Sequence, residues 1–276
     1  RNMKINRRIV VANRKGGVGK TTTAVALAYG LSDLGHRVLL IDLDYQANAT
    51  YQLDFPIDLP DMRDFFLGRR DLVESIYKTD YDGLHLFPGS SEMAGLEADI
   101  ASRMAREQIL RKGLAASKLA YDYVVMDTNP YLGVILHNAM TAATEVVIPV
   151  AAHFSSVGGM MDMFDTMDRI REDLNPELGD GRILITRLDR RTAHAPEVAA
   201  EVRAAFEKET LDTFIRENVT VAEAYTAQQP VQVYDKHCNA SNDYTALVNE
   251  IAAPPHGQGE AQHQSRHSAS SASPQS

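Results

Sequence analysis

The sequence predicts an α/β fold, a single doubly wound and mainly parallel sheet flanked by helices. Two observations predict it. Short apolar runs alternate with stretches of helical period along most of the chain. These runs are continuously apolar rather than alternating, which is typical of strands that are buried on both faces. A glycine-rich turn between the first strand and the first helix adds the context that a phosphate-binding loop requires.

The individual elements follow from local patterns. Arg8–Asn13 is a β-branched run, and the helical stretch Thr21–Leu34 is followed by Gly35, a typical C-cap residue. The next expected elements are strands at Arg37–Asp42 and Leu84–Pro88, one long helix at Ser91–Leu119, and strands at Tyr121–Asp127 and Glu145–Val150. After them we expect a helix at Val157–Leu174, a strand at Gly181–Arg187, a helix at Pro196–Lys208, a short strand at Thr213–Ile215 and a closing helix at Ser241–Ala253.

Composition narrows the class of protein. The 276 residues are 44% apolar and 24% charged, as in ordinary globular proteins. Cys238 is the single cysteine, so an internal disulfide and a cysteine-based metal site within one chain are excluded. No apolar run is long enough to span a membrane and no signal peptide is evident, so we expect a cytoplasmic protein. The net charge of −9 argues against a uniformly basic nucleic-acid binder but leaves room for a local basic patch.

The chain is expected to form one folded domain. Residues 1–7 are interpreted as an N-terminal extension, in which Arg1 and Asn2 precede Met3 and are foreign to the native chain. The domain covers residues 8–253. Residues 254–276 contain no Ile, Leu, Val, Met, Phe or Tyr, so they cannot bury enough apolar surface to offset their ordering entropy. We expect them to form a disordered tail rich in Ser, Gln and His.

The turn from Arg14 to Thr22 has the residues of a phosphate-binding loop. Its glycines allow backbone N–H groups to approach phosphate oxygens, and the helix that follows adds its dipole. Lys20 is expected to bridge the β and γ phosphates, and the hydroxyl of Thr21 to coordinate Mg²⁺. Arg14 stands where the common motif has glycine, and Lys15 adds a second lysine. The expected ATP contacts here are Lys15, Gly16, Gly17, Val18, Gly19, Lys20, Thr21 and Thr22.

Three carboxylates end predicted strands. Asp42 and Asp44 follow the second strand, and Asp127 ends the YDYVVMD strand. The carboxyl ends of parallel strands face the ligand crevice, so these side chains should gather near the phosphates. Their hard oxygen atoms suit Mg²⁺, which predicts a magnesium site.

These motifs together resemble the ParA branch of the ParA/MinD ATPases, which carry a deviant Walker A loop. The resemblance rests on KGGVGKTTT, RVLLIDLDYQANAT and YDYVVMDTNPYLG, and continues through VVIPVAAHFSSVGGM, LDRRT and IRENVTVAEAY. It covers Ile9 to Ile251. The few residues before the loop leave no room for an N-terminal helix-turn-helix domain, so the small type of ParA is expected.

The resemblance assigns roles to the polar residues. It implies that Lys15 reaches the phosphates of the other subunit in a nucleotide-sandwich dimer, and that Asp44 positions or activates the attacking water. It makes Lys15, Lys20 and Asp44 the catalytic residues, and Thr21, Asp42 and Asp127 the magnesium site. Adenine contacts are implied at Arg187, Ile215 and Asn218. Tyr45 and Asn129 depart from the family, which usually has proline at both positions.

The function implied is an ATP-dependent dimerisation switch with slow Mg²⁺-dependent hydrolysis that segregates plasmid or chromosomal DNA. A ParB-like protein would stimulate the ATPase, and the ATP dimer would bind nucleoid DNA without sequence preference, mainly through its phosphates. Relatives carry PRNVRLSEA where this chain has Glu217 and Thr220 in place of arginines, which lowers the expected DNA affinity. The candidate DNA-binding cations are Arg190, Arg191, Arg203, Lys208, Arg216 and Lys236.

Other classes of ATPase share parts of this sequence pattern. A ParA-like ATPase that positions a non-DNA cargo has the same motifs. A MinD-like membrane-cycling ATPase predicts a basic amphipathic C-terminal helix, which the Ser/Gln/His-rich end does not provide. An iron–sulfur ATPase would need paired cysteines, and a synthetase would hydrolyse ATP only with an acceptor substrate. A non-hydrolysing scaffold is disfavoured by the presence of Asp44.

Overall fold

An eight-stranded sheet forms the centre of the computed structural model, which describes residues 7–131, 133–152, 157–192 and 194–253. The strand order is β3-β4-β2-β5-β1-β6-β7-β8, and every neighbouring pair is parallel except β3 and β4. The predicted α/β fold class is therefore confirmed. The strands are β1 Arg7–Val11, β2 Val38–Asp42, β3 Tyr77–Lys78, β4 Leu84–Phe87, β5 Tyr123–Asp127, β6 Glu145–Ala151, β7 Gly181–Leu188 and β8 Thr210–Arg216.

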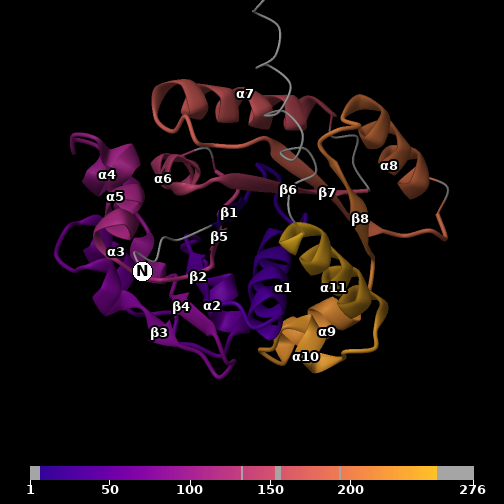
Figure 1. Ribbon diagram of the computed structural model, residues 1–276, viewed down its shortest axis with the longest axis horizontal. Helices are drawn as coiled ribbons and strands as arrows, with labels where there is room; N and C mark the ends of the chain where they lie inside the picture. Colours follow the sequence, from indigo (N-terminus) through magenta and orange to yellow (C-terminus); the bar gives the residue numbers. More distant parts are fainter. Residues whose placement is uncertain (1–6, 132, 153–156, 193, 254–276) are drawn as a thin grey trace, which may run out of the picture.

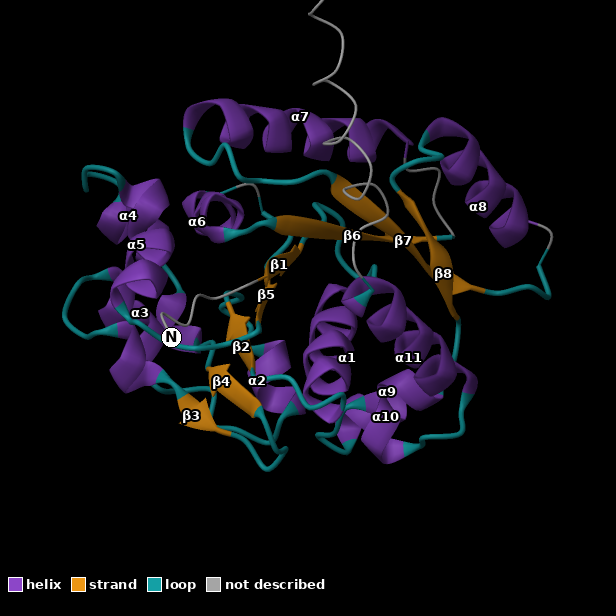
Figure 2. Ribbon diagram, viewed as in Figure 1, coloured by secondary structure: helices purple, strands orange, loops and turns teal. Residues whose placement is uncertain are grey.

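Helices cover both faces of the sheet (Figures 1 and 2). One face carries α1 Lys20–Asp33, α2 Asn48–Gln52, α9 Thr220–Thr226, α10 Val231–Tyr234 and α11 Asn239–Ala252. The other carries α3 Asp61–Phe66, α4 Leu96–Ile100, α5 Ile109–Ala116, α6 Val134–Ala142, α7 Val157–Asp173 and α8 His194–Ala205. Successive residues of β1 point to opposite faces, so Ile9 enters one core and Val10 the other, and both are fully buried.

Helix α1 begins immediately after the glycine-rich loop and ends as the sequence predicts. Its N-cap is Gly19, with φ 88°, and Gly35 after its last turn also has φ 88°. The N–H of His36 donates to the carbonyl of Leu31 at 3.2 Å, which closes the helix end. The helix packs closely on α11, because a Cβ built on Gly30 would lie 2.4 Å from Cγ2 of Val248.

The expected long helix at Ser91–Leu119 is wrong. The segment contains 3₁₀ turns at Ser91–Met93 and Arg106–Gln108, together with the separate helices α4 and α5. Gly95 and Ala105 have φ of 79° and 52°, and a left-handed residue cannot continue a right-handed helix. The final strand is also longer than expected, since β8 covers Thr210–Arg216 rather than three residues.

The expected N-terminal extension and tail fall almost entirely on residues 1–6 and 254–276, which lie outside the described residues. Arg7, assigned to the extension, is instead the first residue of β1. Within the ranges that the structure describes, none of the helices is long and apolar enough to cross a membrane.

Candidate nucleotide-binding site

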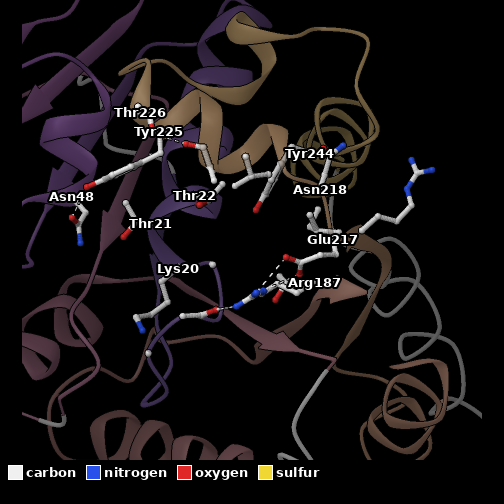
Figure 3. Close-up of a pocket in the computed structure, with 18 of the residues that line it drawn as sticks. Lys20, Thr21, Thr22, Asn48, Arg187, Glu217, Asn218, Tyr225, Thr226 and Tyr244 are labelled. Carbon is white, nitrogen blue, oxygen red and sulfur yellow. Dashed lines mark hydrogen bonds and ion pairs between the residues drawn. The ribbon is translucent and has the colours of Figure 1, made fainter. Parts of the chain in front are cut away.

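A cavity of about 660 Å³ opens between the phosphate loop and the loop after β8. Ten of the residues expected to bind or hydrolyse ATP line it: Gly16, Gly17, Gly19, Lys20, Thr21, Thr22, Asp44, Arg187, Ile215 and Asn218. Arg216, expected to contact DNA, also lines it. Figure 3 shows Lys20, Thr21 and Thr22 on one side and Arg187, Glu217 and Asn218 on the other. Residues that lie far apart in the sequence, 16–22 and 215–244, therefore line one cavity that is large enough for a ligand.

Lys20 is held inside the phosphate loop. Its ammonium donates to the carbonyl of Lys15 at 2.7 Å, and the residue is only 8% exposed. Burial lowers the pKa of Lys20, while the carboxylates of Asp127 and Asp44 act to raise it. The ammonium is thus poised among anions, in the place where phosphate oxygens would replace the carbonyl as its acceptor.

The remaining loop residues do not line the cavity. Val18 is buried, and its carbonyl accepts a hydrogen bond from the Thr186 hydroxyl at 2.7 Å. The backbone N–H of Lys15 donates to Oδ1 of Asn13 at 3.0 Å, which fixes the start of the loop. These contacts shape the loop from behind, so that its other residues face the cavity.

Asp42 and Asp127 lie side by side at the carboxyl ends of two adjacent strands. They are register partners in β2 and β5, and both are fully buried. Oδ2 of Asp42 accepts from the backbone N–H and the hydroxyl of Thr50, at 2.8 and 2.7 Å, and its Oδ1 accepts from the N–H of Asp44. Burial raises the pKa of Asp42 to about 6. Asp42 thereby fixes the loop that carries Asp44.

The carboxylate of Asp127 differs from that of Asp42. Neither of its oxygens accepts a hydrogen bond from another described residue. Burial and the negative charge of Asp42 raise the pKa of Asp127 well above its usual value, while the nearby Thr21 hydroxyl and Lys20 act to lower it. An unpartnered buried carboxylate next to the Thr21 hydroxyl fits a hydrated Mg²⁺. Among the described residues there is no group of three or more His, Cys, Asp or Glu that could hold a metal ion by itself.

Asp44 lies at the cavity wall with one oxygen engaged. Its Oδ1 accepts from the N–H of Gln46 at 2.9 Å, and burial raises its pKa. The Gln46 N–H and the charge of Lys20 act in the opposite direction and favour the carboxylate. The geometry leaves Oδ2 as the atom able to accept a hydrogen bond from a ligand or a water.

The cavity is also lined by residues that the sequence patterns did not indicate, and Figure 3 shows one of them, Asn48, on the same side as Thr21. Thr186, Asn48, Tyr225 and Tyr244 line the cavity, in addition to the expected Arg187, Ile215 and Asn218. The Tyr225 hydroxyl donates to Oδ1 of Asn48 at 2.8 Å, which joins α9 to α2. The aromatic character of Tyr225 and Tyr244 is the one signal in the sequence that could have indicated an aromatic wall of the cavity.

Comparisons with known proteins agree with this geometry. A family model described as an AAA domain matches residues 6–179. The chain is 36% identical to the chromosome partitioning protein ParA of Caulobacter vibrioides, with 88% of this chain and 92% of the relative covered. It is 35% identical to the sporulation initiation inhibitor protein Soj of Bacillus subtilis, over 89% and 98%. The chain belongs to the ParA/MinD family of P-loop ATPases.

A solved structure in this fold carries ligands. Cobyrinic acid a,c-diamide synthase from Mycobacterium smegmatis, with a bound ATP analogue and magnesium, superposes with a TM-score of 0.77 at 29% identity. The match covers 89% of this chain and 93% of the synthase. A protein with the same fold as this chain therefore binds an ATP analogue together with magnesium.

The expected DNA-binding cations of this ParA/MinD chain differ in their surroundings. Arg216 forms an ion pair with Asp243 at 2.6 Å, and Arg191 forms one with Asp189 at 2.9 Å. Arg203 donates to the carbonyl of Asp212. The Arg190 guanidinium lies 4.8 Å from the centre of the Phe214 ring, and Lys208 and Lys236 are exposed.

A second, smaller cavity of about 310 Å³ lies next to the two residues that replace the family's usual prolines. Tyr45 and Asn129, in place of the usual prolines, both line it, together with the exposed Tyr131. The N–H of Tyr131 donates to Oδ1 of Asn129 at 3.0 Å, so this asparagine supplies the turn after β5. The turn therefore forms without proline.

Proposed function

We propose that this protein is a ParA-like partition switch that binds ATP with Mg²⁺, closes a homodimer, and hydrolyses ATP slowly. A ParB-like protein stimulates hydrolysis, and the ATP dimer binds nucleoid DNA without sequence preference. The observation that carries this proposal is the one cavity that brings together Lys20, Thr21 and Asp44, with the unpartnered Asp127 beside them. The relatives named for chromosome partitioning support the biological role.

The residues divide the work of ATP hydrolysis among them. Backbone N–H groups of the loop and the Lys20 ammonium hold the phosphates, since this ammonium already donates to an oxygen at 2.7 Å. Thr21 and Asp127 are the residues that would hold Mg²⁺, which when bound neutralises charge on the phosphate oxygens. Lys15 is proposed to contact the phosphates of the other subunit in the dimer.

Asp44 acts on the water. Its Oδ2 accepts a hydrogen bond from the water and directs the oxygen lone pair at the γ-phosphorus. The P–O bond to ADP breaks as the new P–O bond forms, and the proton of the water passes to Asp44 or to a phosphate oxygen. Asp42 maintains the loop through Thr50 and the N–H of Asp44. Because Gln46 already fixes the other carboxylate oxygen, Asp44 is positioned before the ligand arrives.

DNA binding in this proposal rests on a subset of the expected cations. Arg190, Lys208 and Lys236 form no ion pair with another described residue and remain suited to phosphate contacts, whereas Arg191 and Arg216 already face carboxylates. A nonspecific complex depends on the number of neutralised phosphates, so the expected affinity is modest and falls steeply with salt. The ATP dimer doubles the number of cations on one assembly and thereby couples DNA affinity to the nucleotide.

The likeness to the diamide synthase makes an ATP-dependent amide-forming enzyme the second candidate. That class of enzyme hydrolyses ATP with an acceptor carboxylate, which a cation must hold. The second cavity, beside Asp44, is lined by the carboxylate of Glu97, and the described residues of its lining include no Lys or Arg. Release of phosphate from ATP with no acceptor present would favour the switch, and release only in the presence of a carboxylic acid would favour the synthase.

The proposal is tested with the Asp44→Ala variant and a fluorescent random DNA duplex. Fluorescence anisotropy is measured with ATP–Mg²⁺ and with ADP–Mg²⁺, at two salt concentrations, with Asp58→Ala as the control because Asp58 is exposed and outside the cavity. Release of phosphate from ATP is measured for the same proteins, and we expect it to be lost in Asp44→Ala and retained in Asp58→Ala. We expect Asp44→Ala to bind DNA in the presence of ATP and to dissociate from it as the salt concentration rises. Unchanged phosphate release in Asp44→Ala contradicts the role of this residue. ATP-dependent dimers that do not bind DNA would indicate a protein scaffold for a non-DNA cargo.

A further inference from the structure

We propose that Glu217 is a positioning residue that holds Arg187 against the phosphate loop, so that the loop after β8 and the phosphate loop act as one nucleotide-binding unit. The inference rests on the proposed nucleotide site. It adds Glu217 to that site, although the family pattern has a different residue at this position. Relatives carry arginine at this position, where a contact with DNA would be expected. In this chain the side chain turns to the cavity.

Arg187 is fixed at both ends of its guanidinium. Nη1 donates to the carbonyl of Gly17 at 3.1 Å, while Nε and Nη2 donate to the two carboxylate oxygens of Glu217 at 2.9 and 3.3 Å. Figure 3 shows these contacts crossing the cavity wall. A two-point contact of this kind fixes the plane of the guanidinium as well as its position. Arg187 therefore spans from the loop after β8 to the phosphate loop.

The backbone also indicates a constrained residue. Arg187 has φ 53°, in the left-handed region that an arginine rarely adopts. Such conformations persist where surrounding contacts determine them, and they gather at ligand-binding sites. The contacts with Gly17 and Glu217 are the ones that hold this side chain over the cavity. A loss of Glu217 thus removes the constraint at one end.

A second contact ties the same strand end to the loop. The Thr186 hydroxyl donates to the carbonyl of Val18 at 2.7 Å, so consecutive residues of β7 hold consecutive residues of the phosphate loop. The N–H of Glu217 in turn donates to the carbonyl of Leu188 at 3.2 Å. The chain therefore runs from the phosphate loop, through the end of β7, to the loop that carries Asn218. Ordering either wall by a nucleotide orders the other.

Neutralising Glu217 is expected to weaken nucleotide binding rather than strengthen DNA binding. Without its carboxylate, the Arg187 side chain, which is 46% exposed, gains freedom that it must lose again when nucleotide binds. The ion pair is partly solvated, so a moderate loss of affinity is expected, about two- to fivefold in Kd. Both Glu217→Gln and Arg187→Gln remove the same pair, so their effects should not add.

The test measures the Kd of a fluorescent ATP analogue with Mg²⁺ for wild type, Glu217→Gln, Arg187→Gln and the double variant. Glu177→Gln is the matched control, since Glu177 also pairs with an arginine but lies outside the cavity. We expect Glu217→Gln to raise the Kd and the double variant to bind no more weakly than the weaker single variant.

Two outcomes would overturn the inference. The first is a Kd for the ATP analogue that changes less than twofold in Glu217→Gln while DNA binds more tightly. Glu217 would then act only by weakening DNA binding, with no role in the nucleotide site. Strictly additive effects of the two single variants would show that the pair does not act as a unit. Failure of the proposed function is separate from both, because wild type would then bind no more analogue than the Lys20→Ala variant. Unfolded variants are identified by circular dichroism before titration, and the Arg187→Met variant then replaces Arg187→Gln.

Discussion

The difference in the free energy of unfolding between the Asp42→Asn variant and wild type, both without nucleotide, should shift in favour of the variant as the pH rises. Burial raises the pKa of Asp42 from 3.8 to about 6, so between these values the folded state binds more protons than the unfolded chain. Stability therefore falls as pH rises through this window, and the cost of the buried charge is complete above the folded pKa. The asparagine carries no such charge at any pH.

The magnitude follows from the shift. About two pH units at about 1.4 kcal/mol each correspond to about 3 kcal/mol in total, of which roughly half lies between pH 5 and pH 7.5. The Asp42→Asn variant would also lose part of the bonding to Thr50 and to the N–H of Asp44. That loss does not depend on pH. The change of the stability difference with pH, rather than its absolute value, is the quantity to measure.

The assay is urea unfolding at pH 5, 6 and 7.5 in EDTA, without nucleotide, for wild type and Asp42→Asn. Asp58→Asn is the control, because Asp58 is exposed. We expect the free energy of unfolding of Asp42→Asn minus that of wild type to rise with pH by about 1 to 2 kcal/mol across this range. A difference that is constant to within about 0.5 kcal/mol, or that falls, would refute the reasoning.

The other predictions concern packing, phosphate binding and DNA. Gly30→Ala should lower the free energy of unfolding in urea by about 1–3 kcal/mol, since its Cβ would lie 2.4 Å from Val248; an unchanged value would mean that α1 and α11 move apart freely. Lys20→Ala should abolish binding of a fluorescent ATP analogue while leaving the circular dichroism spectrum unchanged, and retained binding would contradict the assigned phosphate contact. Arg190→Gln should reduce the slope of log affinity for DNA against log salt by about 1, and an identical slope would remove this residue from the interface.

The order of the elements and the place of the phosphate loop could be predicted because their signals are local. A glycine-rich turn between an apolar run and a helical stretch can be recognised without knowledge of distant residues. Gly35 is by itself enough to indicate where the first helix ends. The position of Asp44 next to Lys20 also follows, because parallel strands bring their carboxyl ends to one edge. Such inferences require only the direction of each strand.

The rest could not be predicted because it depends on backbone conformation and on contacts between distant segments. Ala105 precedes the 3₁₀ turn Arg106–Gln108 in a left-handed conformation that alanine does not signal in a sequence. Arg187 and Glu217 pair across 30 residues only because β7 and β8 end together, with Leu188 opposite Arg216 in register. Tyr244 reaches the cavity from α11, near the far end of the domain, and the sequence pattern there indicates only a helix.

The walls of the main cavity come from opposite ends of the chain, and this has a consequence during synthesis. The phosphate loop leaves the ribosome early, whereas Ile215, Tyr225 and Tyr244 follow only after every other strand has been made. A nascent chain that ends at β7 would have the phosphate loop but not the wall of the cavity that Ile215, Tyr225 and Tyr244 supply. In the proposed site, ATP would gain its full set of contacts, and its full stabilising effect, only once α11 has docked on α1.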